Sequence, residues 1–128
     1  LLATAPPARA AALPAGVGLH LAAADAARLE PRPVGDERLL SCACHDAAEL
    51  ARAEALGADL AYLGPVAATA THPAARPLGW ARFAELAAGT TLPLYALGGI
   101  GRDELDVARE AGAVGVAGIR AFWPGAGW

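Results

Sequence analysis

The chain has 128 residues, which is enough for one ordinary domain and too few for two. Its hydrophobic fraction of 55%, with 18% charged residues, argues against disorder. Its net charge of −3, without a clustered arginine patch, argues against nucleic-acid binding, and no apolar run approaches the roughly 20 residues of a membrane span. The chain contains no lysine, so its own residues supply neither a Schiff base nor a lysine–phosphate contact.

Six strand-like segments recur along the chain, and Ala-rich helical stretches separate most of them. Strands that are apolar throughout and alternate with helices indicate a parallel sheet covered by helices. The repeat of about 20–25 residues is compatible with a (β/α) barrel. No Gly-x-Gly-x-x-Gly follows a strand, which disfavours a dinucleotide site. The predicted strands are residues 1–5, 17–21, 39–44, 60–63, 92–97 and 114–119. Since the first segment reads as a strand entered midway, we expect the chain to be a fragment of a longer protein.

Helices are predicted over residues 46–56, 80–88 and 103–111. Asp46 is placed to cap the first helix, with Glu49 three residues later as in a capping box. Apolar residues at three- and four-residue spacing predict which side of each helix faces the core. The residues expected to face inward are Ala47, Leu50, Ala51, Ala55, Phe83, Leu86, Ala87, Leu105, Val107 and Ala108.

The two cysteines, Cys42 and Cys44, lie two residues apart in the strand predicted at 39–44. They share a face with Cα atoms roughly 6.5–7 Å apart, at or beyond the limit of disulfide reach. A Cys-x-Cys metal site needs further ligands, and only His45 is adjacent. We therefore expect two free thiols in or near the core and a cytoplasmic compartment.

Gly98 and Gly99 follow the apolar strand at 92–97, and a polar helix start at 101–104 comes directly after them. Glycines let backbone N–H groups approach an anion, and a helix N-terminus adds positive partial charge. The pattern predicts a phosphate-binding turn. A tight strand-to-helix turn without any ligand is the alternative. The loop at 64–79, rich in Thr and Pro, leaves another strand at what would be its ligand-binding end.

Seven short segments together resemble thiamine phosphate synthase and its TenI-like relatives. The resemblance is closest to the thiamine phosphate synthase-like domain at the C-terminal end of some Nudix hydrolase fusion proteins. The order and spacing of the segments match over almost the whole chain. The segments are 18–21 (Gly-Leu-His-Leu), 40–45, 64–66 (Gly-Pro-Val), 69–71 (Thr-Ala-Thr), 77–79 (Pro-Leu-Gly), 97–100 (Leu-Gly-Gly-Ile) and 115–117.

This resemblance implies a partial TIM (β/α)8 barrel in which residues 1–128 supply strands three to eight. It also implies the joining of hydroxymethylpyrimidine diphosphate to thiazole phosphate, with Mg²⁺ assisting the departure of diphosphate. Asp25 matches one of the family's metal-binding carboxylates, and the other is absent. The residues that match or are placed for phosphate binding are Thr69, Thr71, Gly98, Gly99, Gly118, Ile119 and Arg120.

Departures from the family pattern leave the activity open. Ala43 stands where the family has an active-site Ser, and His72 stands where it has a Lys. One alternative is a non-catalytic, ligand-binding accessory domain of a Nudix hydrolase of the 8-oxo-dGTP diphosphatase type. Another is a thiazole tautomerase, which needs no metal and uses a histidine to move a proton.

Candidate proton carriers for such a tautomerase are His20, His45 and His72. Each has a plain structural alternative: a hydrogen-bonded core residue for His20, a capping residue for His45 and a solvated loop residue for His72. Asp25 can equally be a capping or solvent-facing residue, and Arg120 can pair with a carboxylate instead of a phosphate. A six-stranded part of a barrel would leave two open sheet edges, which favours self-association.

Overall fold

The computed structural model describes residues 2–4, 10, 12–28, 32–68 and 76–117. Six strands form one parallel sheet in the order β1-β2-β3-β4-β5-β6. All six predicted strands are confirmed, within one or two residues at the ends that the structure describes. The strands are β1 (Leu2–Thr4), β2 (Gly18–Leu21), β3 (Leu40–Cys44), β4 (Leu60–Leu63), β5 (Leu94–Leu97) and β6 (Gly115–Ala117).

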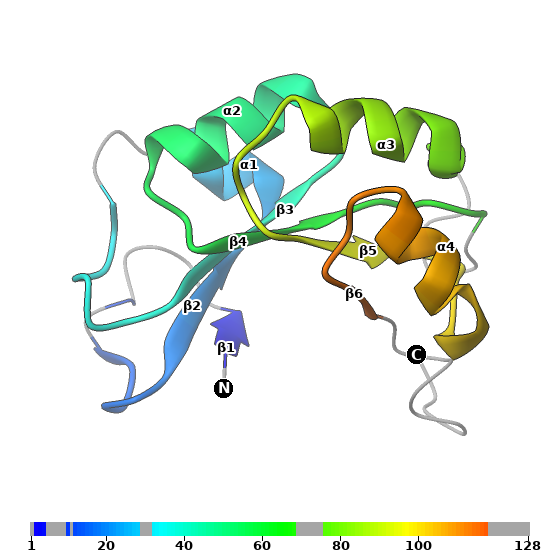
Figure 1. Cartoon of the computed structure of the whole chain (residues 1–128). Helices are drawn as coiled ribbons and strands as arrows, with labels where there is room; N and C mark the ends of the chain where they lie inside the picture. Colours follow the sequence, from blue (N-terminus) through cyan, green and yellow to red (C-terminus); the bar gives the residue numbers. More distant parts are fainter. Residues whose placement is uncertain (1, 5–9, 11, 29–31, 69–75, 118–128) are drawn as a thin grey trace.

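The helices lie on one side of the curved sheet, and the other face is concave (Figure 1). Strands joined in sequence order through helices on one face are the arrangement of a (β/α) barrel. The fold is therefore the predicted partial barrel. The helices are α1 (Ala23–Ala26), α2 (Ala47–Ala55), α3 (Gly79–Ala88) and α4 (Leu105–Glu110), the last preceded by a 3₁₀ turn at Arg102–Glu104. None of the helices in these ranges is long and apolar enough to cross a membrane.

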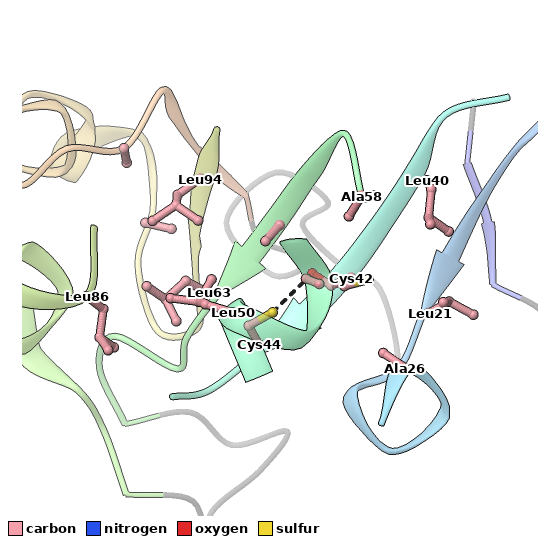
Figure 2. Close-up of a cluster of buried hydrophobic side chains, with 14 of the residues drawn as sticks. Leu21, Ala26, Leu40, Cys42, Cys44, Leu50, Ala58, Leu63, Leu86 and Leu94 are labelled. Atoms are coloured by element: carbon pink, nitrogen blue, oxygen red, sulfur yellow. Dashed lines mark hydrogen bonds between the residues drawn. The ribbon is translucent and has the colours of Figure 1, made fainter. Parts of the chain in front are cut away.

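The hydrophobic core fills the space between the sheet and the helices (Figure 2). Alternate strand residues point to this side, as the two-residue period of a strand requires. The fully buried ones are Leu19, Leu21, Leu40, Cys42, Cys44, Ala61, Leu63, Leu94 and Ala96. Phe83 and Leu86 of α3 join them, as predicted. Burying these side chains contributes about 25 cal/mol for each Å² of apolar surface removed from water.

Cys42 and Cys44 are both free and buried in this core, as predicted. The Cys44 Sγ lies 4.0 Å from the carbonyl oxygen of Cys42, which makes a weak hydrogen bond within the strand. Burial raises the pKa of Cys42 to about 11 and that of Cys44 to about 12. Both thiols are therefore protonated and chemically inert at neutral pH.

The predicted buried face of α2 is wrong in part. Leu50 and Ala53 are the buried residues of this helix, and Leu56 just after it is also buried. The expected Ala47, Ala51 and Ala55 are exposed. Alanine is small and nearly neutral toward burial, so an Ala-rich helix takes its orientation from its leucines. Leu50, Ala53 and Leu56 follow one another at three-residue spacing and so lie along one side of the helix.

The start of α2 follows the predicted cap with one change. Asp46 accepts a hydrogen bond from the backbone N–H of Glu49 (2.8 Å), as an N-cap should. The Glu49 carboxylate, however, accepts from the backbone N–H of His45 (2.8 Å). In a capping box it would accept from the N–H of Asp46 instead. The exchange therefore spans one residue more than a capping box, and it ties His45 to the first turn of the helix.

Two arginines hold the loops at the amino ends of the strands. The Arg38 guanidinium donates to the carbonyl oxygens of Leu13 (2.8 Å), Pro14 (2.8 Å) and Val17 (2.6 Å). Arg32 in turn donates to the carbonyl oxygen of Arg38 (2.6 Å). These bonds satisfy loop carbonyls that no strand partner reaches. In a barrel this end serves stability, and the opposite end carries ligands.

Candidate ligand site at the carboxyl ends of the strands

The carboxyl ends of β4 and β5 are joined by their loops. The backbone N–H of Val66 donates to the carbonyl oxygen of Leu97 (2.9 Å), and that of Ala67 donates to the carbonyl oxygen of Gly98 (3.0 Å). Parallel strands end at the same edge, so these loops form one continuous rim. This rim is the edge at which a (β/α) barrel binds its ligands.

Gly98 and Gly99 form the tight turn that the sequence predicts. Their φ angles are +97° and +68°, which side chains with a Cβ rarely adopt. A Cβ on Gly98 would lie 2.6 Å from the Cα of Pro65, and one on Gly99 would lie 2.5 Å from the carbonyl oxygen of Ala68. Glycine is required at both positions because the loop after β4 packs directly on the turn.

Apart from the pairing of β5 with β6, the backbone N–H groups of Gly98 and Gly99 donate to no backbone acceptor among the residues that the structure describes. Two successive free N–H groups in a turn make a small anion-binding concavity. The N–H of Gly101, which directly precedes the turn at Arg102–Glu104, does have an acceptor: it donates to the carboxylate of Glu104 (2.7 Å). The Glu104 N–H returns a bond to the carbonyl oxygen of Gly101 (3.1 Å).

The predicted helix start after this turn is therefore wrong in its detail. Residues 102–104 form a 3₁₀ turn, and the α-helix begins only at Leu105. The first turn contains Asp103 and Glu104, whose negative charges oppose the positive partial charge expected of a helix N-terminus. The case for an anion at this edge rests on the two glycine amides, and the helix adds little to it.

Four side chains on the concave face form a second part of the site, and sequence analysis identified only one of them. They are His20, Ser41, Tyr62 and Tyr95, one from each of β2 to β5. The His20 Nδ1 lies 2.8 Å from the Oγ of Ser41. The rings of His20 and Tyr62 meet edge to face, with centroids 5.4 Å apart. The ring of Tyr95 continues the row, 5.7 Å from that of Tyr62.

This row, which we call the concave row, is polar but uncharged at neutral pH. Burial lowers the pKa of His20, which favours the neutral imidazole. Burial raises the pKa of Tyr62, and the neighbouring Tyr95 raises it further. An uncharged aromatic surface with hydrogen-bonding groups suits a planar heteroaromatic ring.

His45 lies at the carboxyl end of β3 with its side chain 56% exposed. Its Nδ1 is 2.9 Å from the Glu49 carboxylate, the same group that accepts from its backbone N–H. These contacts with Glu49 fit both the capping role and the proton-carrying role that the sequence predicts for His45. Glu49 holds the ring by its Nδ1, and more than half of the side chain is exposed.

Asp25 lies in α1, just beyond the carboxyl end of β2, and is half-buried. Within the described ranges no three His, Cys, Asp or Glu side chains gather as a metal site would require. Mg²⁺ takes near-octahedral oxygen coordination, usually from one or two carboxylates together with phosphate oxygens and water. The expected role of Asp25 in holding Mg²⁺ therefore stays a prediction.

Six predicted site residues lie outside the part of the chain that the structure describes. They are Thr69, Thr71, His72, Gly118, Ile119 and Arg120. Their expected roles in binding phosphate or moving a proton therefore stay predictions. Among the described candidates, Gly98 and Gly99 lie together at the rim, and His20 belongs to the concave row.

The turn at Gly98 and Gly99 and the concave row together define the ligand face of a (β/α) barrel. A family model described as thiamine monophosphate synthase matches residues 8–122. The chain therefore belongs to the thiamine monophosphate synthase family, as the sequence motifs predict.

Curated relatives agree with this assignment, and a solved structure shows the same fold. The chain is 41% identical over 106 residues to a thiamine-phosphate synthase of Prochlorococcus marinus (strain MIT 9313), covering 82% of this chain and 30% of the relative. It is 32% identical over 105 residues to a putative thiamine-phosphate synthase 2 of Aquifex aeolicus, covering 82% of this chain and 56% of the relative. A thiamine phosphate pyrophosphorylase from Pyrococcus furiosus matches with a TM-score of 0.70 at 23% identity, covering 91% of this chain and 55% of that one. The chain thus spans between 30% and 56% of the length of these proteins.

Proposed function

We propose that this chain forms the phosphate- and ring-binding part of a thiamine phosphate synthase barrel. The observation that carries the proposal is the turn at Gly98 and Gly99 at the ligand edge of the sheet, whose N–H groups donate to no described backbone acceptor apart from the pairing of β5 with β6. These amides suit the phosphate of a thiazole phosphate, and the uncharged concave row suits a heteroaromatic ring. The ligand is therefore a phosphorylated thiazole or pyrimidine, and the proposed compartment is the cytoplasm.

In the family reaction, the bond between the pyrimidine methylene carbon and the diphosphate oxygen breaks, and its electron pair leaves with the diphosphate. The thiazole nitrogen then donates its lone pair to that carbon, and a C–N bond forms. This chain contributes donors that hold the thiazole phosphate in position, which converts a bimolecular encounter into an oriented one. Charge developing on diphosphate needs cations, and no lysine of this chain can supply one.

Binding of the phosphate is tested by titration with thiazole phosphate, followed by NMR of the backbone amides. We expect the amide signals of Gly98 and Gly99 to shift, and the unphosphorylated thiazole to leave them in place. Gly99→Ala should weaken binding at least tenfold. Gly89→Ala adds the same methyl group at the end of α3, where a Cβ meets only ordinary contacts of 3.6 Å and beyond. Absence of binding at millimolar thiazole phosphate would overturn the proposal.

An accessory role without catalysis is the second candidate, and it is favoured because no metal-binding group of three His, Cys, Asp or Glu side chains, around Asp25 or elsewhere, occurs among the described residues. In this role the chain binds the ligand for a Nudix hydrolase carried in the same parent polypeptide. Diphosphate release from hydroxymethylpyrimidine diphosphate in the presence of thiazole phosphate separates the two candidates. Release above the uncatalysed rate supports coupling, and ligand binding without release supports the accessory role.

A thiazole tautomerase is the third candidate, and the contact between His45 and Glu49 favours it. A carboxylate that holds one imidazole nitrogen orients the other nitrogen toward a reacting proton. NMR of the thiazole isomer ratio tests this candidate. Isomerisation that is lost in His45→Gln would support it, and an unchanged isomer ratio in the presence of the wild-type chain would exclude it.

A further inference from the structure

Ser41 and His20 face each other across β2 and β3, where the two residues are partners in the strand register. The Ser41 side chain is buried, with none of its surface exposed, and its Oγ lies 2.8 Å from the His20 Nδ1. The edge-to-face contact with Tyr62 holds the other side of the imidazole. The ring is thus fixed in position by two neighbours from different strands.

The position of one proton follows from this geometry. The Ser41 hydroxyl carries one hydrogen, and within the described residues its side-chain hydrogen bond is the one to His20. A fully buried hydroxyl proton without an acceptor is costly, so this hydroxyl donates to the His20 Nδ1. A nitrogen that accepts a hydrogen bond carries no proton. In a neutral imidazole the single proton then lies on Nε2.

We propose that Ser41 is a positioning residue that holds His20 in the Nε2–H tautomer, so that His20 is a hydrogen-bond donor on the concave face. The lowered pKa of His20 agrees with this, because it favours the neutral ring. No described residue forms a hydrogen bond with Nε2. The titratable neighbour in ring contact is Tyr62, which is uncharged at neutral pH.

The tautomer has a chemical consequence, which rests on the proposed function. A protonated Nε2 recognises an acceptor atom of the ligand, such as an unprotonated ring nitrogen or an oxygen. It cannot take a proton while Nδ1 is occupied by Ser41, so His20 is unsuited to act as the base of a tautomerase. Of the three candidate histidines, His20 therefore serves recognition, and proton transfer falls to His45 or His72.

The tautomer is measured directly by NMR of the 128-residue chain with ¹⁵N-labelled histidine, at a pH where the imidazoles are neutral. The chain has three histidines, and His20→Gln identifies the signals of His20 by their loss. We expect one tautomer for His20, with Nε2 protonated and Nδ1 bare. A protonated Nδ1 in the wild-type chain would overturn the proposal without any variant.

Ser41→Ala removes the hydroxyl and should give a mixture of tautomers at His20. Ser41→Thr retains the hydroxyl and should restore the single Nε2–H form, which a merely structural role of Ser41 would not require. An unmixed Nε2–H signal in Ser41→Ala would contradict the role of Ser41. If Ser41→Ala does not fold, the wild-type tautomer and the Ser41→Thr spectrum still decide the proposal.

Ligand binding separates this inference from the proposed function. His20→Gln places an amide N–H near the position of Nε2, and His20→Asn is too short to reach it. With thiazole phosphate or hydroxymethylpyrimidine diphosphate as the probe, His20→Gln should lose less than fivefold in affinity and His20→Asn more than tenfold. Equal losses would refute the donor role. If neither probe binds the wild-type chain, the proposed function fails while the tautomer spectrum still tests Ser41.

Discussion

Gly98 lies so close to Pro65 that a Cβ built on it would stand 2.6 Å from the Pro65 Cα. The glycine turn after β5 and the loop after β4 are therefore one packed unit. This contact fixes the direction of the Gly98 and Gly99 amides independently of any ligand. A binding site built on such a turn is preorganised, which reduces the entropy lost when a ligand binds.

The contact predicts the effect of Gly98→Ala. An alanine at φ +97° costs about 1–2 kcal/mol in backbone strain, and the clash with Pro65 adds to that cost. Gly16→Ala is the matched control, because Gly16 has φ +81° and no atom within 4 Å of its would-be Cβ. Urea unfolding should show a clearly larger loss of stability for Gly98→Ala than for Gly16→Ala. Equal losses would mean that the loop yields and that the turn is not packed as described.

The Arg38 guanidinium predicts a stability effect at the opposite end of the strands. Arg38→Ala removes hydrogen bonds to three loop carbonyl oxygens and should lower the free energy of unfolding by about 1–3 kcal/mol. Arg38→Lys should recover only part of this, because an ammonium group lacks the planar fork of donors. Arg28→Ala, at an exposed position, is the control and should stay within about 0.5 kcal/mol of the wild type. A loss of similar size in both alanine variants would contradict a specific role for Arg38.

The buried thiols predict a pH dependence. Burial raises the pKa of Cys42 from its ordinary value of 9.0 to about 11, so between these values the folded state holds a proton that the unfolded state has lost. Stability therefore falls as the pH rises above 9, by at most about 1.4 kcal/mol per pH unit for each thiol. Below pH 9 neither state loses the proton, and the contribution is fully present.

Urea unfolding of the wild type and of Cys42→Ala across pH 8–11 measures this slope. The variant should show a shallower decline, since one titrating thiol is gone. Iodoacetamide labelling gives an independent readout, because Cys42 and Cys44 should react only after unfolding. Rapid labelling of either thiol in the native chain would show that the core admits solvent there.

Much of the fold could be predicted from the sequence because its strands are short apolar runs bounded by polar or turn residues. The concave row could not, apart from His20. In a parallel barrel both faces of each strand are largely covered, so strand sequences do not alternate clearly between apolar and polar residues. Ser41, Tyr62 and Tyr95 therefore read as ordinary members of apolar strands. Only the register between strands places them in one row.

The errors in the helices have a related physical origin. In α2, alanines at many positions fit several buried faces equally well, and Leu50 decides the orientation only through tertiary packing. At the turn before α4, Glu104 binds the Gly101 amide and stabilises a 3₁₀ turn where the sequence pattern indicates an α-helix. Local side-chain bonds of this kind compete with regular helix geometry and leave no periodic signal in the sequence.

The ends of the sheet give the last prediction. β1 and β6 stand at opposite ends of the sheet order and do not pair with each other in the described part of the chain. Unpaired strand edges present free N–H and C=O groups to other molecules, and a parallel barrel removes them only by closing. We expect the isolated chain to self-associate with rising concentration, as multi-angle light scattering measures.

Two exposed apolar residues make a matched test of which edge is involved. Val114 precedes β6 at the edge of the sheet and is 50% exposed, whereas Leu39 precedes β3, which is paired on both sides, and is 51% exposed. A charge beside an edge strand opposes pairing with another chain. Val114→Lys should therefore shift the association to higher concentration, and Leu39→Lys should have a smaller effect. A monomer at all concentrations, or equal effects of the two substitutions, would show that the edges do not drive association.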